Sequence, residues 1–151
     1  MPDVRVKICG LMRPRDARHA ADAGADYLGA ILSEGFGRSV PAVLARKFTQ
    51  PGGPPLVAVF VDEPTGDAVA KARQVSASVL QLHGNESPVV VDELRREGSW
   101  ELWKAVRQMI LWLAGVHIHK WLGFRLLINL KRIISSRFHQ FGLNLLISAQ
   151  K

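Results

Sequence analysis

The chain has 151 residues, of which 48% are hydrophobic and 22% are charged, and its formal net charge is +7. This length and composition predict one folded domain with its own core and exclude a disordered chain. One cysteine excludes an internal disulfide, no apolar run is long enough to span a membrane, and residues 1–10 lack a secretory pattern, so we expect a cytoplasmic protein.

Short apolar runs alternate with helical stretches through the first two thirds of the chain. The runs span residues 4–9, 27–33, 56–62, 78–84 and 101–107. The helical stretches lie at 15–24, from Pro41 onward, near 66–75 and near 87–97, and their starts carry Pro, Asp or Ser. This alternation predicts βα units around a parallel sheet, and its period fits both a doubly wound sheet and an eight-stranded barrel.

Polar residues share one face of the first run. Alternation places Arg5, Lys7 and Cys9 together, opposite the apolar face. The outer face of a barrel strand meets helices, so the polar face is expected to point inward, with Cys9 at the mouth. A thiol there acts as a base or nucleophile where positive charge favours the thiolate, and Lys7 supplies such a charge. The alternative is that Cys9 is a small buried hydrophobe.

Two further candidates follow the second and fourth runs. Gln81 and His83 end one face of the fourth run, which indicates a polar mouth above a packed core. A structural role for His83 is the alternative. Arg38 lies in a Gly-rich loop, where it would pair with a carboxylate or phosphate of a substrate, the alternative being a solvated surface arginine.

The last fifty residues differ from the rest in charge. Residues 1–101 carry 12 Lys and Arg against 13 Asp and Glu, whereas residues 102–151 carry 8 basic and no acidic residues. We therefore divide the chain into the βα units of 1–107 and a divergent basic segment, 108–151, interpreted as a degraded sixth unit. Such a segment would also suit a polyanion or a membrane surface. We favour a drifted segment, with neither nucleic acid nor membrane as a partner.

Taken together, the motifs of residues 4–106 resemble the phosphoribosylanthranilate isomerase family. The shared motifs, in order, are VKICGL, AGADYLGAIL, an Arg-Ser loop before a Pro, AVFVD, QLHG and WKAV. The resemblance implies an α/β fold, a parallel TIM-type (β/α) barrel, here incomplete with five to six βα units instead of eight. It also implies an aldose–ketose isomerase of tryptophan biosynthesis that needs no cofactor or metal and takes a small phosphorylated substrate.

The implied reaction is the Amadori rearrangement of N-(5′-phosphoribosyl)anthranilate to 1-(2-carboxyphenylamino)-1-deoxyribulose 5-phosphate. In the family, a general acid opens the ribose ring and the cysteine, here Cys9, removes the C2 proton. The loop arginine, here Arg38, contacts the anthranilate, and we expect the remaining substrate contacts from Lys7, Gln81 and His83.

The resemblance weakens beyond residue 106. The family's acid is an aspartate ending the sixth strand, and Asn129 stands in that position, although an amide cannot act as an acid at pH 7. Residues 135–138 replace the family's Gly-rich phosphate loop, and its last two strands have no counterpart. We therefore expect an isomerase by descent that is truncated and inactive. The alternative is a non-catalytic barrel fragment stabilised by self-association or by a partner.

Overall fold

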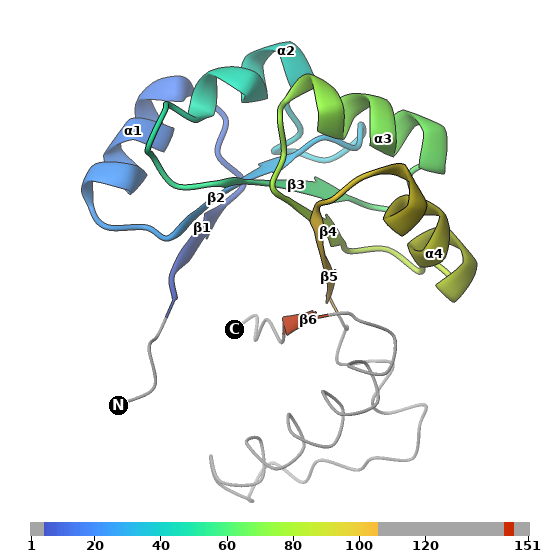
Figure 1. The fold of residues 1–151 in the computed structure, drawn as a ribbon. Helices are drawn as coiled ribbons and strands as arrows, with labels where there is room; N and C mark the ends of the chain where they lie inside the picture. Colours follow the sequence, from blue (N-terminus) through green and yellow to red (C-terminus); the bar gives the residue numbers. More distant parts are fainter. Residues whose placement is uncertain (1–4, 106–143, 147–151) are drawn as a thin grey trace, which may run out of the picture. The chain divides into compact units, whose positions relative to one another are not determined.

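A computed structural model describes residues 5–105 and 144–146, and the chain divides into two compact units, Met1–Glu101 and Leu102–Lys151 (Figure 1). Within the first unit, four parallel strands pair in chain order. They are β1 (Lys7–Cys9), β2 (Tyr27–Ile31), β3 (Leu56–Phe60) and β4 (Val79–Leu82). This is the parallel α/β arrangement that the period of the apolar runs predicted.

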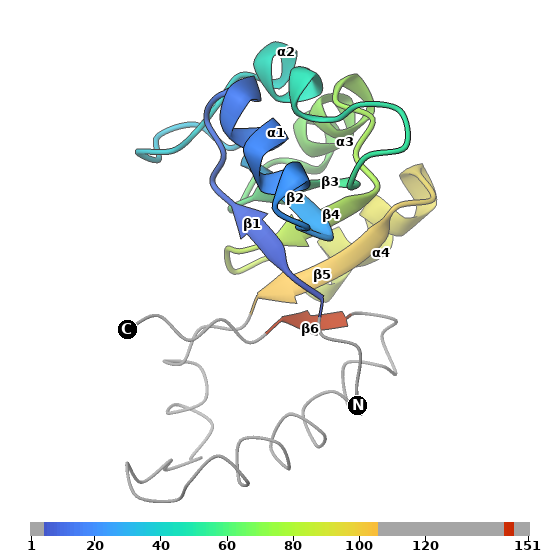
Figure 2. The ribbon, with the colours of Figure 1, turned by 90° about the vertical axis from the view of Figure 1, so that its left-hand side faces the viewer.

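Helices cover one face of this sheet, as Figures 1 and 2 show. They are α1 (Pro14–Asp22), α2 (Ala42–Ala45) with the short 3-10 helix η1 (Arg46–Phe48), α3 (Thr65–Gln74) and α4 (Pro88–Glu97). Pro14 and Pro88 begin two of them, where a missing N–H costs nothing. The register places Ala30, Ala58 and Leu80 on one face, and all three are fully buried. Burial of a side chain as large as that of Leu80 contributes about 1.5–3 kcal/mol to the free energy of unfolding.

The first strand is shorter than the run at 4–9 predicted. The main chain before it is held by a side chain, because the Val6 N–H donates to Asp26 Oδ2 at 2.6 Å. The Val6 carbonyl accepts from the N–H groups of Asp26 and Tyr27 at 2.8 and 3.1 Å. The strand therefore begins at Lys7, and the start of the apolar run is anchored by a turn of the neighbouring segment.

Strand β5 (Glu101–Ala105) begins at the last residue of the first unit, and in the second unit it pairs in parallel with β6 (Asn144–Leu146). Expectations for Asn129, for the replaced loop at 135–138 and for the rest of the sixth unit lie outside the described residues and stay predictions. In the part of the chain that the structure describes, no helix is long and apolar enough to cross a membrane.

A hydrogen bond between two distant strands shows that the sheet of the first unit is curved. Strands β1 and β4 are three strand spacings apart, about 14 Å in a flat sheet. Lys7 Nζ nevertheless donates to Gln81 Oε1 at 2.5 Å. Side chains that stand perpendicular to a flat sheet would not meet over that span. The face that carries Lys7 and Gln81 is therefore concave, as the inner wall of a barrel is.

Candidate active site

The concave face brings together three of the residues predicted from the sequence. Lys7 Nζ lies 3.2 Å from Cys9 Sγ while it donates to the amide of Gln81, which is only 3% exposed. Cys9 is the last residue of β1, and it is exposed rather than packed in the core. The interpretation of Cys9 as a buried hydrophobe is therefore wrong. A buried amide instead holds an ammonium group beside an accessible thiol.

A glycine that sequence reasoning missed makes room for this pair. Gly29 lies opposite Cys9 in the register of β1 and β2. A Cβ atom at position 29 would stand 2.9 Å from both Cys9 Sγ and Lys7 Cε. The sequence signal was present, because a glycine inside a strand often marks a close approach of other groups.

A second glycine, Gly10, leaves room for the side chain of Arg38. Gly10 directly follows Cys9 and has a φ of +75°, and a Cβ atom there would lie 2.8 Å from the Cζ of Arg38. The guanidinium therefore lies against the main chain next to Cys9. A planar guanidinium at this place can bind a carboxylate or phosphate with two hydrogen bonds.

His83 lies at the same end of the sheet, one residue beyond β4. Its N–H donates to the carbonyl of Phe60 at 2.8 Å and extends the ladder between β3 and β4. Strand alternation gives it the same face as Gln81, and its side chain is half-buried. The described contacts thus join Lys7, Cys9 and Gln81 directly, and Arg38 through Gly10, while the strand places His83 at the same end of the sheet.

The close approach of Gly84 to Asp62 allows the packing at this edge of the sheet to be tested. An added Cβ at Gly84 would collide with the carboxylate of Asp62 and stand 2.6 Å from its main-chain nitrogen. Because main chain cannot yield cheaply, we expect Gly84→Ala to lower the free energy of unfolding by about 1–3 kcal/mol in urea titrations. Gly66→Ala is the matched control, since nothing lies within 4 Å of its Cβ. Equal stability of the two variants would contradict this packing.

No group of His, Cys, Asp and Glu side chains within residues 5–105 and 144–146 has an arrangement that would hold a metal ion. Among the titratable side chains of the concave face, Lys7 and Cys9 are in contact with each other. The arrangement can therefore offer a base, a cation and an arginine to an anionic substrate.

Comparison with known proteins connects this geometry to one family. The family model for N-(5′-phosphoribosyl)anthranilate (PRA) isomerase matches residues 6–109. The N-(5′-phosphoribosyl)anthranilate isomerase of Acidithiobacillus ferrooxidans is 44% identical over 91 residues, which cover 58% of this chain and 44% of the relative. That of Rubrobacter xylanophilus is 39% identical over 105 residues, 68% of this chain and 50% of the relative. The chain thus spans half or less of the length of these relatives.

Solved structures agree with the sequence comparison. The phosphoribosyl anthranilate isomerase of Thermus thermophilus is 33% identical, with a TM-score of 0.63 over 68% of this chain and 52% of that one. The enzyme of Thermotoga maritima gives a TM-score of 0.71 over 99% of this chain and 64% of that one. Its identity is 23%, so this second likeness shows the fold alone.

Proposed function

Because this chain belongs to the phosphoribosylanthranilate isomerase family, we propose that its first unit forms the base-bearing part of an isomerase active site. The substrate would be N-(5′-phosphoribosyl)anthranilate, rearranged without a cofactor in tryptophan biosynthesis in the cytoplasm. The observation that carries this proposal is the contact of Lys7 with both Gln81 and Cys9 across the concave face.

In this proposal, Cys9 is the general base. After the ribose ring opens, Cys9 Sγ takes the proton from C2 of the sugar, which is the step that moves the double bond toward the ketose. The Lys7 ammonium, 3.2 Å from Sγ, stabilises the negative charge that the thiolate carries before this transfer. Gln81 keeps the ammonium in place by accepting its second hydrogen bond.

Arg38 would orient the substrate. Its guanidinium lies against Gly10, one residue from the base, so a carboxylate bound there places the rest of the molecule over Cys9. The anthranilate ring of the substrate carries such a carboxylate, and we assign it to Arg38. His83 is proposed to contact the substrate from the end of β4.

A second candidate is a non-catalytic barrel fragment that associates with another copy. Val6, which precedes β1, and Ile8, on the face of β1 opposite Lys7, are 46% and 40% exposed. Exposed apolar side chains that adjoin one another are typical of association surfaces. A solved Thermotoga maritima relative, 32% identical, consists of monomers generated from a dimeric phosphoribosylanthranilate isomerase. Sedimentation equilibrium at several concentrations distinguishes this candidate when combined with the binding experiment below.

The proposed function predicts that a product analogue protects Cys9 from alkylation. The analogue is reduced 1-(o-carboxyphenylamino)-1-deoxyribulose 5-phosphate, with which a related isomerase was crystallised. Because Cys9 is the single cysteine and is exposed, the rate of modification by iodoacetamide, followed by mass spectrometry, reports on this site alone. We expect saturable slowing by the analogue.

Substitutions at two arginines complete the binding experiment. Arg38→Ala should raise the analogue concentration needed for protection about tenfold or more, since hydrogen bonds to charged groups are each worth about 1.5–3 kcal/mol. Arg15→Ala removes an arginine whose side chain is 65% exposed on α1 and should change nothing. Failure of the analogue to protect the wild-type chain at any concentration would refute the proposal, and association of the chain would then favour the second candidate.

A further inference from the structure

Two serines, Ser33 and Ser39, connect the two ends of the loop that carries Arg38. Ser39 Oγ donates to the carbonyl of Ser33 at 2.6 Å and accepts from the N–H of Phe36 at 3.1 Å. One residue further on, the Val40 N–H donates to the carbonyl of Ile31 at 2.9 Å. Ser39 is the residue next to Arg38, so these bonds fix the main chain from which the guanidinium extends.

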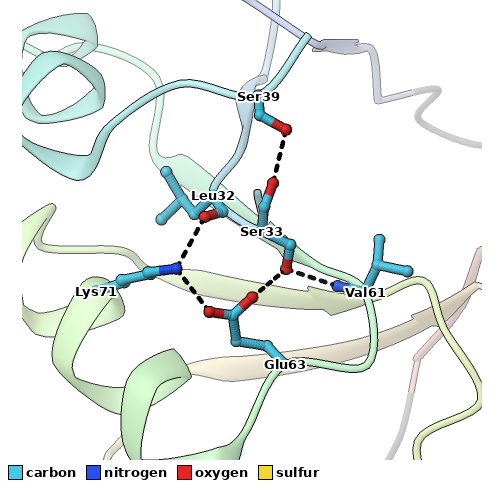
Figure 3. A network of polar contacts seen from close by, with 6 residues as sticks. All are labelled: Leu32, Ser33, Ser39, Val61, Glu63 and Lys71. Carbon is cyan, nitrogen blue, oxygen red and sulfur yellow. Dashed lines mark hydrogen bonds and ion pairs between the residues drawn. The ribbon is translucent and has the colours of Figure 1, made fainter. Parts of the chain in front are cut away.

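At Ser33, the carboxylate of Glu63 joins three segments of the chain, as Figure 3 shows. Glu63, between β3 and α3, accepts from Ser33 Oγ at 2.5 Å and from Lys71 Nζ at 2.6 Å. Lys71, on α3, also donates to the carbonyl of Leu32 at 3.2 Å. Ser33 Oγ in turn accepts from the N–H of Val61 at 3.0 Å. We refer to Ser33, Ser39, Glu63 and Lys71 as the Glu63 cluster.

Burial makes the Glu63 cluster more than a surface ion pair. Ser33 is 2% exposed, and the side chains of Glu63 and Lys71 are 11% and 26% exposed. An exposed pair would do little to fix a loop, because water competes for both charges. A shielded pair in which each carboxylate oxygen has its own donor holds one geometry, and removal of either partner leaves a charge without compensation.

The Glu63 cluster contacts neither Cys9 nor Lys7 in its described hydrogen bonds, so its link to the site is the Arg38 loop. We propose that the Glu63 cluster consists of positioning residues that hold the Arg38 guanidinium over Gly10, beside Cys9. The assignment of Arg38 as the group that binds the substrate carboxylate rests on the proposed function. The position of the guanidinium does not, and it can be measured separately.

The charge preference of Cys9 alkylation measures where the guanidinium lies. Anionic iodoacetate and neutral iodoacetamide both react with the thiolate. The rate with iodoacetate divided by the rate with iodoacetamide is therefore independent of the thiolate fraction, and it rises with positive charge near Cys9. A unit charge several ångströms from the thiolate changes this ratio about two- to fivefold in a water-exposed site. Arg38→Ala should therefore lower the ratio by that factor in the full chain.

The same measurement tests the Glu63 cluster. Ser39→Ala and Glu63→Ala are expected to lower the ratio toward the Arg38→Ala value, whereas Ser39→Thr, which keeps the hydroxyl, should retain the wild-type value. Glu93→Ala is the matched control, because Glu93 accepts from Thr65 Oγ1 at 2.6 Å near the start of α3 but makes no described hydrogen bond to the loop. Thermal melts accompany each variant, and the two Ser39 variants decide the outcome if Glu63→Ala does not fold.

Two results would overturn the inference. One is an unchanged ratio in Arg38→Ala, which would mean that the guanidinium is not beside Cys9. The other is a wild-type ratio in Ser39→Ala and Glu63→Ala when Arg38→Ala lowers it. Analogue protection in the wild-type chain is measured in parallel. Its absence would refute the proposed function, while the alkylation ratios would still decide whether the Glu63 cluster positions Arg38.

Discussion

Replacement of Gly29 by alanine is expected to weaken protection of Cys9 by the product analogue about tenfold to a hundredfold, with little loss of stability. The new Cβ would stand 2.9 Å from Cys9 Sγ and from Lys7 Cε, closer than real Cβ contacts allow. Both are side-chain atoms that can move aside, whereas the Cα of Cys9, 3.1 Å from the new Cβ, is main chain and must shift by a few tenths of an ångström. Displacement of Lys7 would remove a proposed contact to the analogue, and a hydrogen bond to a charged group is worth about 1.5–3 kcal/mol, or roughly tenfold to a hundredfold in affinity.

Gly29→Ala is expected to lower the affinity for the analogue more than it lowers the free energy of unfolding. Overpacking costs about 1–3 kcal/mol where nothing can yield. Here side-chain rotation relieves the contacts with Sγ and Cε, which leaves a small main-chain shift at Cys9, and the reduced freedom of the unfolded chain offsets about 0.4–1 kcal/mol. Gly66→Ala controls for the added methyl group, because it has open space around its Cβ. Unchanged analogue affinity in Gly29→Ala would show that the Lys7–Cys9 contact is unimportant for binding.

The sequence predicted the fold and one face of the site because both depend on local periodicity. Alternation with a period of two separates Lys7 and Cys9 from Ile8 in the first run. The same rule groups Gln81 with His83 on one face of the fourth run. Helix starts at Pro14 and Pro88 follow from residue type alone. These signals lie within a few residues of one another, so they can be read without any knowledge of tertiary contacts.

Contacts between distant residues could not be predicted in the same way. Lys7 and Gln81 are 74 positions apart, and only the curvature of the sheet brings them within hydrogen-bonding distance. Ser33 and Glu63 are separated by 30 positions, and a lysine on α3 would ordinarily be assigned to solvent. A glycine inside a strand, such as Gly29, signals a close approach of other groups, but the sequence does not identify the side chains that Gly10 and Gly29 admit.

The full chain is expected to show little or no isomerase turnover, about 10²–10⁴-fold below an otherwise equal site with its acid, because the family resemblance puts an amide at the position of the general acid. Residues 102–151 contain no Asp or Glu, and the family resemblance assigns the acid position to Asn129. An amide has no acidic proton to give at pH 7. The measurement is the loss of fluorescence of phosphoribosylanthranilate with purified chain, set beside Cys9→Ala and buffer.

Carboxylates at the described edge of the sheet are poor substitutes for the missing acid. Glu63 accepts from Lys71 and Ser33, while Asp62 and Glu86 accept main-chain N–H groups at 2.6–3.1 Å. Each of these carboxylates is therefore already bound to a donor within the protein. A folded chain whose rate equals that of Cys9→Ala and of buffer would agree with the loss of the acid. Robust turnover that Cys9→Ala abolishes would show that another group donates the proton, and substitution of Asp62, Glu63 and Glu86 in turn would then identify whether it is one of these three.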